Sequence, residues 1–421
     1  MENGPDYISK DELLYPQGKK FQDIIQHIAD VPFYKKKLSN EGINISHIKE
    51  ISDLKELPFT TKEELRLSRP MERTPLNYDG IAFFFSSSGT SGNPTVYPWS
   101  KGDDLVLREV AARCMERIGV GPGDTSLILS PFGMPIMWYC MINQYIACGA
   151  SVVPLGMTTS KDVIKAMSAF PITSIATLPV VGTRLFEFMK MKDILVEKNR
   201  LRHFHFGGEY LSNARRRRIE HNWNAECYDF YGLSEIFGPI AGECKEKAGL
   251  HLAADFIYVE VIDPFTKEPV PEGGVGVAVY TTLWKKAAPL LRYWSDDFVS
   301  ITYETCKCGR TSPRITYLGR AIDAVLINNK IFFSKDIEEI LLSFPEVSNE
   351  WEMRLEGSNE ETIAKIYTEE TANEVPREKI EHELGKLLGI QVDFQIVPFD
   401  SFSRENIKPR RIKDERQKAN E

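Results

Sequence analysis

The chain has 421 residues, of which 42% are hydrophobic and 27% charged, and its formal net charge is -8. This composition is typical of a globular protein with more than one domain, and the acidic balance argues against nucleic acid or an anionic membrane as a partner. Residues 1–14 lack the pattern of a signal peptide, and no run approaches the roughly 20 apolar residues of a membrane-spanning helix. Together with seven irregularly spaced cysteines, these features predict a cytoplasmic protein.

The first 75 residues are predicted to be helical. Ser9 is a candidate helix cap, and Ile24 and Ile28 recur at helical spacing in the segment that follows. A further helix is expected to begin at the sequence PFTTKEELR, with Thr60 or Thr61 as its cap.

Short apolar runs alternate with helical segments from residue 80 onward. This alternation predicts a mainly parallel sheet with helices packed on its faces. The helix after the last of these runs carries four consecutive arginines, Arg215 to Arg218, which we expect to form a solvated basic face. The predicted strands are residues 81–85, 125–130, 150–155, 172–178 and 202–208.

The pattern changes twice in the second half of the chain. Residues 256–303 hold three predicted strands without helices, which indicates a β-rich subdomain. After Gly319-Arg320, a hairpin across Asn328-Asn329 precedes two helices and three strands, and the second helix is opened by Pro376 and closed by Gly389. We therefore predict a large domain over residues 1–320 and a compact α+β domain over residues 321–421.

A turn rich in serine and glycine follows the run FFF in FFFSSSGTSGNPTVYPWS (83–100). Small residues let the backbone approach an anion, and hydroxyls add hydrogen-bond donors, so the turn indicates a phosphate cradle. It does not fit the P-loop pattern G-x-x-x-x-G-K-[ST]. A flexible connection is the alternative interpretation for such a turn taken alone.

Four further stretches follow in order: YGLSEIFGP (231–239), PLLRYWSDD (289–297), CKCGRTSPRITYLGR (306–320) and SFSRENIKPRRIKDER (401–416). With the serine-glycine turn, they resemble the phenylacetate-CoA ligase family of adenylate-forming enzymes. The resemblance implies an α/β fold with a large N-terminal domain, built of mainly parallel sheets and a β-rich subdomain, and a small mobile α+β C-terminal domain. It also implies ATP-dependent activation of an aryl or arylacetic acid as acyl-AMP, followed by transfer to the thiol of CoA.

The resemblance assigns roles to individual residues. Glu235 corresponds to a magnesium ligand, Asp297 to the acceptor for the ribose hydroxyls, Arg320 to a phosphate or ribose partner at the hinge, and Lys408 to the catalytic lysine. The alternatives are a structural acceptor for Glu235, a surface turn for Asp297 and a solvated side chain for Lys408. The remaining nucleotide-binding candidates are Ser87, Ser88, Gly89, Thr90, Ser91, Gly92 and Ser234 for the phosphates, and Glu209, Asp229, Phe230 and Tyr231 for adenine.

The acyl pocket of the family begins near residue 132. Phe132, Met134, Trp138 and Tyr139 are the candidates here, since aromatic side chains would pack well against an aromatic acid. A stripe of methionine and aromatic residues at helical spacing is also typical of plain core, and this alternative stays open.

Cys244, His251, Cys306 and Cys308 are candidate zinc ligands. Three thiolates and one imidazole make a closed tetrahedral set, which is typical of structural zinc, although buried reduced thiols are the alternative. The resembling family carries the same elements, and some members bind zinc there. We place this predicted zinc site in the β-rich subdomain around residues 240–318.

The chain departs from the family pattern in four motifs. Asn93 replaces a lysine in the phosphate loop, Trp294 and Asp296 replace residues of the ribose motif, Ile322 replaces a hinge aspartate, and Asn328-Asn329 replace Arg-Gly in the turn that lines the pantetheine tunnel. Two alternatives therefore stay open: transfer to an amine or a carrier-protein thiol, and a non-catalytic nucleotide-binding homologue. Many family members are dimers, so a homodimer is among the expectations.

Overall fold

The computed structural model describes residues 4–87, 94–194, 200–358, 361–371, 374–404 and 409–416. The chain divides into two compact units. The first unit comprises Met1–Thr177, His203–Gly208 and Tyr228–Tyr317. The second unit comprises Leu178–Arg202, Glu209–Cys227 and Leu318–Glu421.

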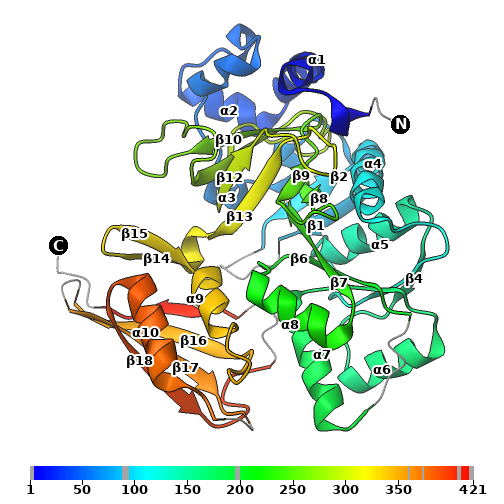
Figure 1. Cartoon of the computed structure of the whole chain (residues 1–421). Coiled ribbons are helices and arrows are strands. Elements are labelled where there is room, and N and C mark those ends of the chain that lie inside the picture. Colours follow the sequence, from blue (N-terminus) through cyan, green and yellow to red (C-terminus); the bar gives the residue numbers. More distant parts are fainter. Residues whose placement is uncertain are drawn as a thin grey trace. The chain divides into compact units, whose positions relative to one another are not determined.

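The elements are labelled in Figure 1, and none of the described helices is long and apolar enough to cross a membrane. The α-helices are α1 (Lys10–Ile28), α2 (Pro32–Asn40), α3 (Lys62–Leu67), α4 (Lys101–Ile118), α5 (Met137–Ala147), α6 (Ser160–Ala169), α7 (Pro179–Met191), α8 (Asn213–Trp223), α9 (Ser334–Leu341) and α10 (Arg377–Leu388). The 3-10 helices are η1 (Pro5–Tyr7), η2 (Ile45–His47), η3 (Ile51–Glu56), η4 (Pro70–Arg73), η5 (Tyr78–Gly80) and η6 (Ala321–Asp323).

The strands form one large sheet and three smaller ones. They are β1 (Phe83–Ser86), β2 (Val96–Trp99), β3 (Thr125–Ile128), β4 (Ser151–Pro154), β5 (Ser174–Thr177), β6 (His203–Gly207), β7 (Glu226–Leu233), β8 (Phe237–Gly242), β9 (Leu250–Leu252), β10 (Ile257–Ile262), β11 (Gly276–Thr282), β12 (Tyr293–Thr302), β13 (Arg314–Arg320), β14 (Ala324–Ile327), β15 (Lys330–Phe333), β16 (Trp351–Gly357), β17 (Thr362–Glu369), β18 (Gln391–Val397) and β19 (Ile412–Asp414).

Helix ends follow the local signals in the sequence. The Ser9 side chain caps α1 in a capping box with Glu12, and Thr61 caps α3 in the same way. Pro376 is the N-cap residue of α10, and Gly389 ends that helix in the left-handed conformation. These expected boundaries are confirmed.

The large sheet has eleven strands in the order β10-β11-β12-β13-β9-β8-β7-β6-β5-β3-β4. Strands β4, β3, β5 and β6 are parallel, whereas the β7-β8-β9 and β10-β11-β12 pairings are antiparallel. The α/β fold class is therefore confirmed, with the β-rich part continuing the same sheet. In the described residues, the strand expected at residues 81–85 belongs to a separate two-stranded sheet, where β1 pairs with β2 in antiparallel fashion.

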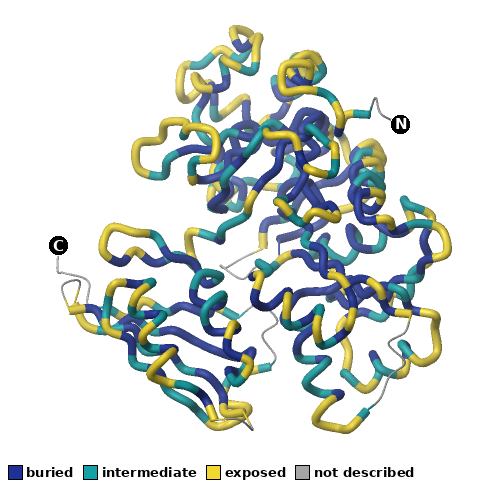
Figure 2. Tube along the Cα trace, viewed as in Figure 1, coloured by how far each residue is buried: buried dark blue, intermediate teal, exposed yellow. Residues whose placement is uncertain are grey.

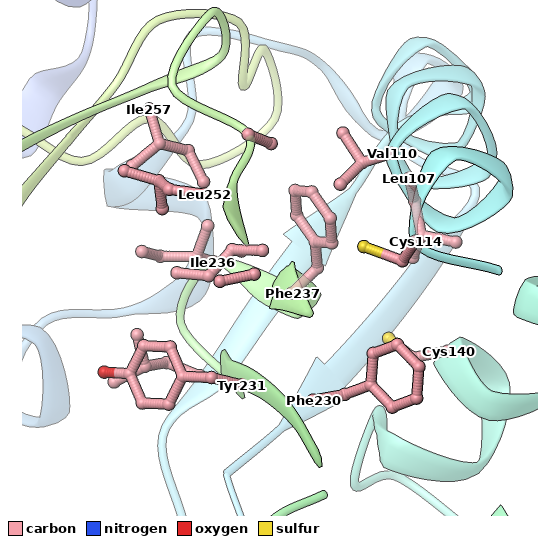
Figure 3. Packing of buried hydrophobic residues seen from close by; sticks show 14 of the residues in the cluster. Leu107, Val110, Cys114, Cys140, Phe230, Tyr231, Ile236, Phe237, Leu252 and Ile257 are labelled. Atoms are coloured by element: carbon pink, nitrogen blue, oxygen red, sulfur yellow. The ribbon is translucent and has the colours of Figure 1, made fainter. Parts of the chain in front are cut away.

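The main core of the first unit lies between this sheet and the helices α4 and α5. Figure 3 shows Phe237 of β8 beside Leu107, Val110 and Cys114 of α4, and Phe230 of β7 beside Cys140. Figure 2 shows that burial follows the strands, whereas connecting loops are mostly exposed.

The second unit contains the four-stranded sheet β18-β17-β16-β19 and the hairpin β14-β15. Helix α10 packs against β18, and α9 contributes Ile337 and Leu341 to the same core. Asn328 and Asn329 turn the hairpin with φ values of 49° and 61°. Asparagine tolerates this left-handed region, so the predicted hairpin is confirmed.

The arginine run of α8 is not a solvated basic face, contrary to the sequence expectation. Arg215 and Arg216 are buried, and Arg215 forms a bidentate ion pair with Glu338 of α9. Arg218 donates to carbonyl groups at the end of α9, including Leu342 O at 2.9 Å. Among these arginines only Arg217 is exposed. The run therefore serves packing within the second unit.

Candidate functional site

The serine-glycine turn connects β1 and β2. Ser87 is buried, its amide donates to the carbonyl of Thr95 at 2.9 Å, and its hydroxyl accepts from the Thr95 amide at 3.0 Å. These bonds fix the two ends of the turn. Ser88, Gly89, Thr90, Ser91 and Gly92 lie outside the described residues.

Asp297 and Tyr231 form a buried pair in the first unit. The Tyr231 hydroxyl donates to Asp297 Oδ2 at 2.6 Å and accepts from the Tyr280 hydroxyl at 2.9 Å. Burial, and then the Asp297 carboxylate, raises the pKa of Tyr231 well above its ordinary value. Tyr231 is thus a neutral phenol that fixes one oxygen of Asp297.

Adjacent residues of β7 point in opposite directions. Figure 3 shows Phe230 and Tyr231 on opposite sides of the strand, and the Phe230 ring lies 5.6 Å from that of His205, in an edge-to-face arrangement. Asp229 is half-buried, and its amide donates to Glu243 Oε2 at 2.7 Å. Of the adenine candidates in β7, Tyr231 contacts Asp297 directly.

Glu235 lies in the turn between β7 and β8, and its side chain is almost fully buried at 4% exposure. The phenols of Tyr97 and Tyr293 face it, and burial, followed by the Glu235 charge, raises the pKa of both well above the ordinary value. The fully buried Lys285 donates from Nζ to the Glu235 carbonyl. Ser234, next to Glu235, is half-buried.

Sequence reasoning missed several buried side chains around Glu235. Burial lowers the pKa of Lys285 to about 8, while Asp103 and Glu235 oppose that shift. The guanidinium of Arg73 is also buried and lies 5.1 Å from the centre of the Tyr97 ring. A lysine inside the apolar run TTLWKKAAPLL was the available signal for Lys285.

The four predicted metal ligands converge in the first unit. One ligand atom from each of Cys244, His251, Cys306 and Cys308 lies within 4.8 Å of all the others. The Sγ atoms of Cys244 and Cys306 are 3.8 Å apart, and Cys308 Sγ is 3.5 Å from His251 Nε2. A tetrahedral zinc with Zn–S bonds of about 2.3 Å requires ligand separations of about 3.8 Å. The donor set and spacing therefore fit such a metal.

Further contacts orient His251. Its Nδ1 lies 2.9 Å from the Ser312 hydroxyl, a contact of the kind that fixes the orientation of a metal-binding imidazole. Burial, and then Arg117, lowers the pKa of His251 to about 3, so the ring is neutral at pH 7. The neutral imidazole is the form that binds a metal.

The second unit holds three other predicted residues. Glu209 and Arg320 are half-buried, and Arg320 opposes the increase in pKa that burial imposes on Asp323. Lys408 lies outside the described residues. Three positions later, Arg411 is buried, and its Nη1 is 3.0 Å from the Glu350 carboxylate.

The predicted acyl-pocket residues lie at and before the start of α5. Phe132 and Met134 are exposed, and the Phe132 ring is 5.4 Å from that of Trp138. The ring of Tyr139 lies 5.2 Å from those of Phe83 and Phe85, and its hydroxyl donates to Asp104 at 2.6 Å. These residues form a partly exposed aromatic group instead of plain core.

Two family profiles match the chain. That of the AMP-binding enzymes covers residues 24–281, and that of the AMP-binding enzyme C-terminal domain covers residues 330–416. These matches show that the chain belongs to the AMP-binding enzyme family, and the relatives described next place it among the phenylacetate-coenzyme A ligases.

The relatives carry that more specific name. The phenylacetate-coenzyme A ligase of Thermus thermophilus is 32% identical over 369 residues, which cover 86% of this chain and 83% of that enzyme. The Aromatoleum evansii ligase of the same name is 28% identical and covers 97% of this chain and 96% of its own length. The Escherichia coli ligase is 27% identical, with coverage of 96% and 95%.

Solved structures share the fold. A 2-hydroxyisobutyryl-CoA ligase in the postadenylation state, in complex with 2-HIB-AMP, matches with a TM-score of 0.88 at 22% identity, covering 97% of this chain and 90% of that one. The same enzyme in the thioesterification state, with 2-HIB-AMP and CoA, matches with a TM-score of 0.71 at 23% identity, covering 97% and 91%.

Proposed function

We propose that the protein is an AMP-forming acid-thiol ligase that activates an aromatic carboxylic acid with ATP and transfers the acyl group to CoA. The observation that carries the proposal is that both family profiles match, so the chain contains the catalytic and the C-terminal part of such a ligase. The phenylacetate-coenzyme A ligase from Thermus thermophilus supports an aromatic acid as the substrate class.

In the first step, a carboxylate oxygen of the acid attacks the α-phosphorus of ATP, and pyrophosphate leaves with the bonding electron pair. Residues Ser87 to Gly92, with Ser234, would donate hydrogen bonds to the phosphates. Lys408 would place its ammonium between the α-phosphate and the attacking carboxylate, which offsets the negative charge that develops there. Arg320 would supply a second positive charge at the phosphates or hydrogen bonds to the ribose.

Asp297 would accept hydrogen bonds from the ribose hydroxyls. Tyr231 supports this role because its hydroxyl donates to Asp297 Oδ2 at 2.6 Å and so fixes the orientation of the carboxyl group. Tyr231 would also line the adenine site, together with Glu209 and Asp229. Phe230 contributes to the packing against His205.

In the second step, the CoA sulfur attacks the acyl carbon of the acyl-AMP, and AMP leaves as the thioester forms. We propose that residues 321–421 form the mobile domain that presents the β14-β15 hairpin to CoA. The Asn328-Asn329 turn favours a second candidate, transfer to an amine or a carrier-protein thiol. Asn328 Nδ2 donates to the Gly389 carbonyl at 3.1 Å, which ties this turn to α10.

The proposal includes two metals. Glu235 is a fixed buried carboxylate and would hold magnesium together with phosphate oxygens, a ligand set that suits this cation. Cys244, His251, Cys306 and Cys308 would hold a structural zinc, because their spacing fits a closed tetrahedral site. The zinc would stabilise the fold, since four protein ligands leave no position for a substrate.

We also propose a cytoplasmic location, because none of the seven cysteines, all of which lie in the described residues, forms a disulfide bond, and this suits a reducing compartment. A homodimer, the assembly of many family members, is part of the same proposal. Light scattering of the purified protein measures it directly.

Acid-dependent exchange between ATP and labelled pyrophosphate tests the proposal. The assay contains magnesium, no CoA, and a panel of arylacetic, benzoic, hydroxybenzoic and short aliphatic acids. Exchange with an aromatic acid is the expected result, and Lys408→Ala should abolish most of it. Adding CoA then tests the acceptor: thioester should form, whereas exchange without thioester would favour an amine or a carrier thiol. If the protein binds nucleotide but shows no exchange with any acid, the non-catalytic alternative would be favoured.

A further inference from the structure

The segment around Asp6 packs against the loop that carries two of the predicted zinc ligands. The amides of Thr311 and Ser312 donate to the Asp6 carbonyl at 2.9 and 3.1 Å. The Thr311 hydroxyl donates to the Ile8 carbonyl at 2.6 Å. These bonds join the start of the chain to the segment that directly follows the C-x-C cysteines, about 303 positions further along the sequence.

The Asp6 side chain reaches the other arm of the metal cluster through Arg117 of α4. Arg117 donates from Nε to Asp6 Oδ2 and from Nη2 to Asp6 Oδ1, both at 2.8 Å, and both side chains are buried. The remaining guanidinium nitrogen, Nη1, donates to the His251 carbonyl at 2.8 Å. A guanidinium engaged at all three nitrogens has one orientation, so Asp6 also constrains the backbone at His251.

Ser312 brings these two connections together. Its hydroxyl lies 2.9 Å from Nδ1 of His251, while its amide donates to the Asp6 carbonyl. A metal-binding histidine is usually oriented through its second ring nitrogen, and loss of such a partner lowers metal affinity about 10- to 100-fold. His251 is therefore held at its backbone and at its ring by groups that are bonded to Asp6.

The charges around Asp6 complement those of a zinc-loaded site. Burial alone would raise the pKa of Asp6, but Arg117, followed by Arg113, outweighs it, so the carboxylate is ionised at pH 7. Arg113 also pairs with Asp255 at 3.0 Å, whereas Arg310 lies 3.5 Å from Asp6. Arg117 and Arg310 together exceed the charge of Asp6 by one. Zinc with three thiolates and a neutral imidazole carries one negative charge, which this excess balances.

We propose that Asp6 is a positioning residue for the zinc site and that residues 5–8 close this site. The inference goes beyond the four proposed ligands and rests on the proposal that they hold zinc. Residues 5–8 would keep the two arms of the site together and thereby slow release of the metal. Coupling between two binding events is reciprocal, so removing zinc should loosen the attachment of residues 5–8.

The variant Asp6→Asn tests this role, because it keeps the size of the side chain and removes the charge that holds Arg117. In competition with a chromophoric chelator, the zinc affinity of the full-length protein should fall about 10- to 100-fold. Asp11→Asn is the matched control, since Asp11 is an exposed carboxylate at the start of α1, and it should leave the affinity unchanged. If Asp6 only anchors the start of the chain, the unfolding midpoint falls while the zinc affinity stays the same, which overturns the inference.

Hydrogen exchange of the wild-type protein tests the coupling without a substitution. After a chelator removes zinc, the amides of residues 4–20 should exchange at least about 10-fold faster, whereas those of α6 should be unaffected. Unchanged exchange in residues 4–20, or equal acceleration in α6, overturns the coupling. This measurement decides the question even where Asp6→Asn does not fold.

Failure of the proposed zinc site gives a different result from failure of this inference. A wild-type protein that binds no zinc overturns the proposed metal, and the inference with it. Equal zinc affinity in Asp6→Asn and Asp11→Asn overturns the inference alone. Neither readout depends on activation of an acid, so the ligase proposal is tested separately by ATP-pyrophosphate exchange.

Discussion

Arg215 of α8 and Glu338 of α9 form a bidentate ion pair, with Nε–Oε1 and Nη2–Oε2 distances of 2.9 and 2.6 Å. Both side chains are buried, at 2% and 0% exposure. The Glu338 carboxylate also accepts from the Ser212 hydroxyl at 2.6 Å and the Trp351 indole at 3.2 Å. The pair thus joins two helices and a strand of the second unit that are distant in sequence.

Removing one member of this pair should destabilise the second unit. Arg215→Met leaves the Glu338 carboxylate buried without its counter-ion, and breaking a buried pair in this way costs about 3 to 5 kcal/mol. Thermal unfolding followed by circular dichroism measures the loss. Arg217→Met is the control, since the Arg217–Glu339 pair is exposed and should contribute at most about 1 kcal/mol. Equal losses in the two variants would contradict this role of Arg215.

The same pair predicts a pH dependence of stability. Burial alone would raise the pKa of Glu338, but Arg215 outweighs it and lowers the pKa to about 2. In the unfolded chain the pKa of this carboxyl group is about 4.3, so below about pH 5 the unfolded chain binds more protons than the folded chain. Stability should therefore be complete above pH 5 and fall as the pH drops towards 2. Thermal unfolding midpoints measured from pH 7 to pH 3 should fall less steeply in the double variant Arg215→Met/Glu338→Met than in the wild-type protein. Parallel curves for the two proteins would contradict the lowered pKa of Glu338.

Local signals in the sequence predicted the parts of the fold that depend on a few neighbouring residues. The Ser9 cap and the hairpin across Asn328-Asn329 are of this kind, since their hydrogen bonds close within a few positions. The burial of Arg215 could not be predicted, because Glu338 lies 123 positions away and only folding brings the two together. The separate β1-β2 hairpin was missed for a related reason: hydrophobicity indicates a strand but does not choose its partner.

The candidate site divides in the same way. Three cysteines and one histidine made Cys244, His251, Cys306 and Cys308 a candidate metal site, and the resemblance to the phenylacetate-CoA ligase family favoured zinc over buried reduced thiols. The surroundings of Glu235 were not predictable, since Tyr97 and Lys285 come from strands and loops far along the chain. Tyr97 lies on β2 of the separate hairpin, whereas Lys285 follows β11 of the large sheet, and the sequence did not specify either strand pairing.

The metal cluster should contain one zinc per chain in protein purified without chelators, as measured by inductively coupled plasma mass spectrometry. Cys306→Ser and Cys308→Ser should lose the metal and at least about 2 kcal/mol of stability, roughly 4 to 8 °C in the unfolding midpoint. Cys148→Ser is the control, a half-buried thiol outside the cluster. Full zinc content in Cys308→Ser, or none in the wild type, would contradict the proposed site.

Lys285 is predicted to be a positioning residue for Glu235. Its buried ammonium donates to the Glu235 carbonyl, so Lys285→Met should release the turn between β7 and β8. Because small displacements of a catalytic group are costly, kcat for ATP-pyrophosphate exchange should fall about 10- to 100-fold while KM for the acid stays within about 3-fold. Lys286→Met is the matched control, because this neighbouring lysine is exposed and should tolerate the change. Similar kinetics in the two variants would mean that Lys285 does not position Glu235, and a rise in the acid KM alone would assign Lys285 to substrate binding instead.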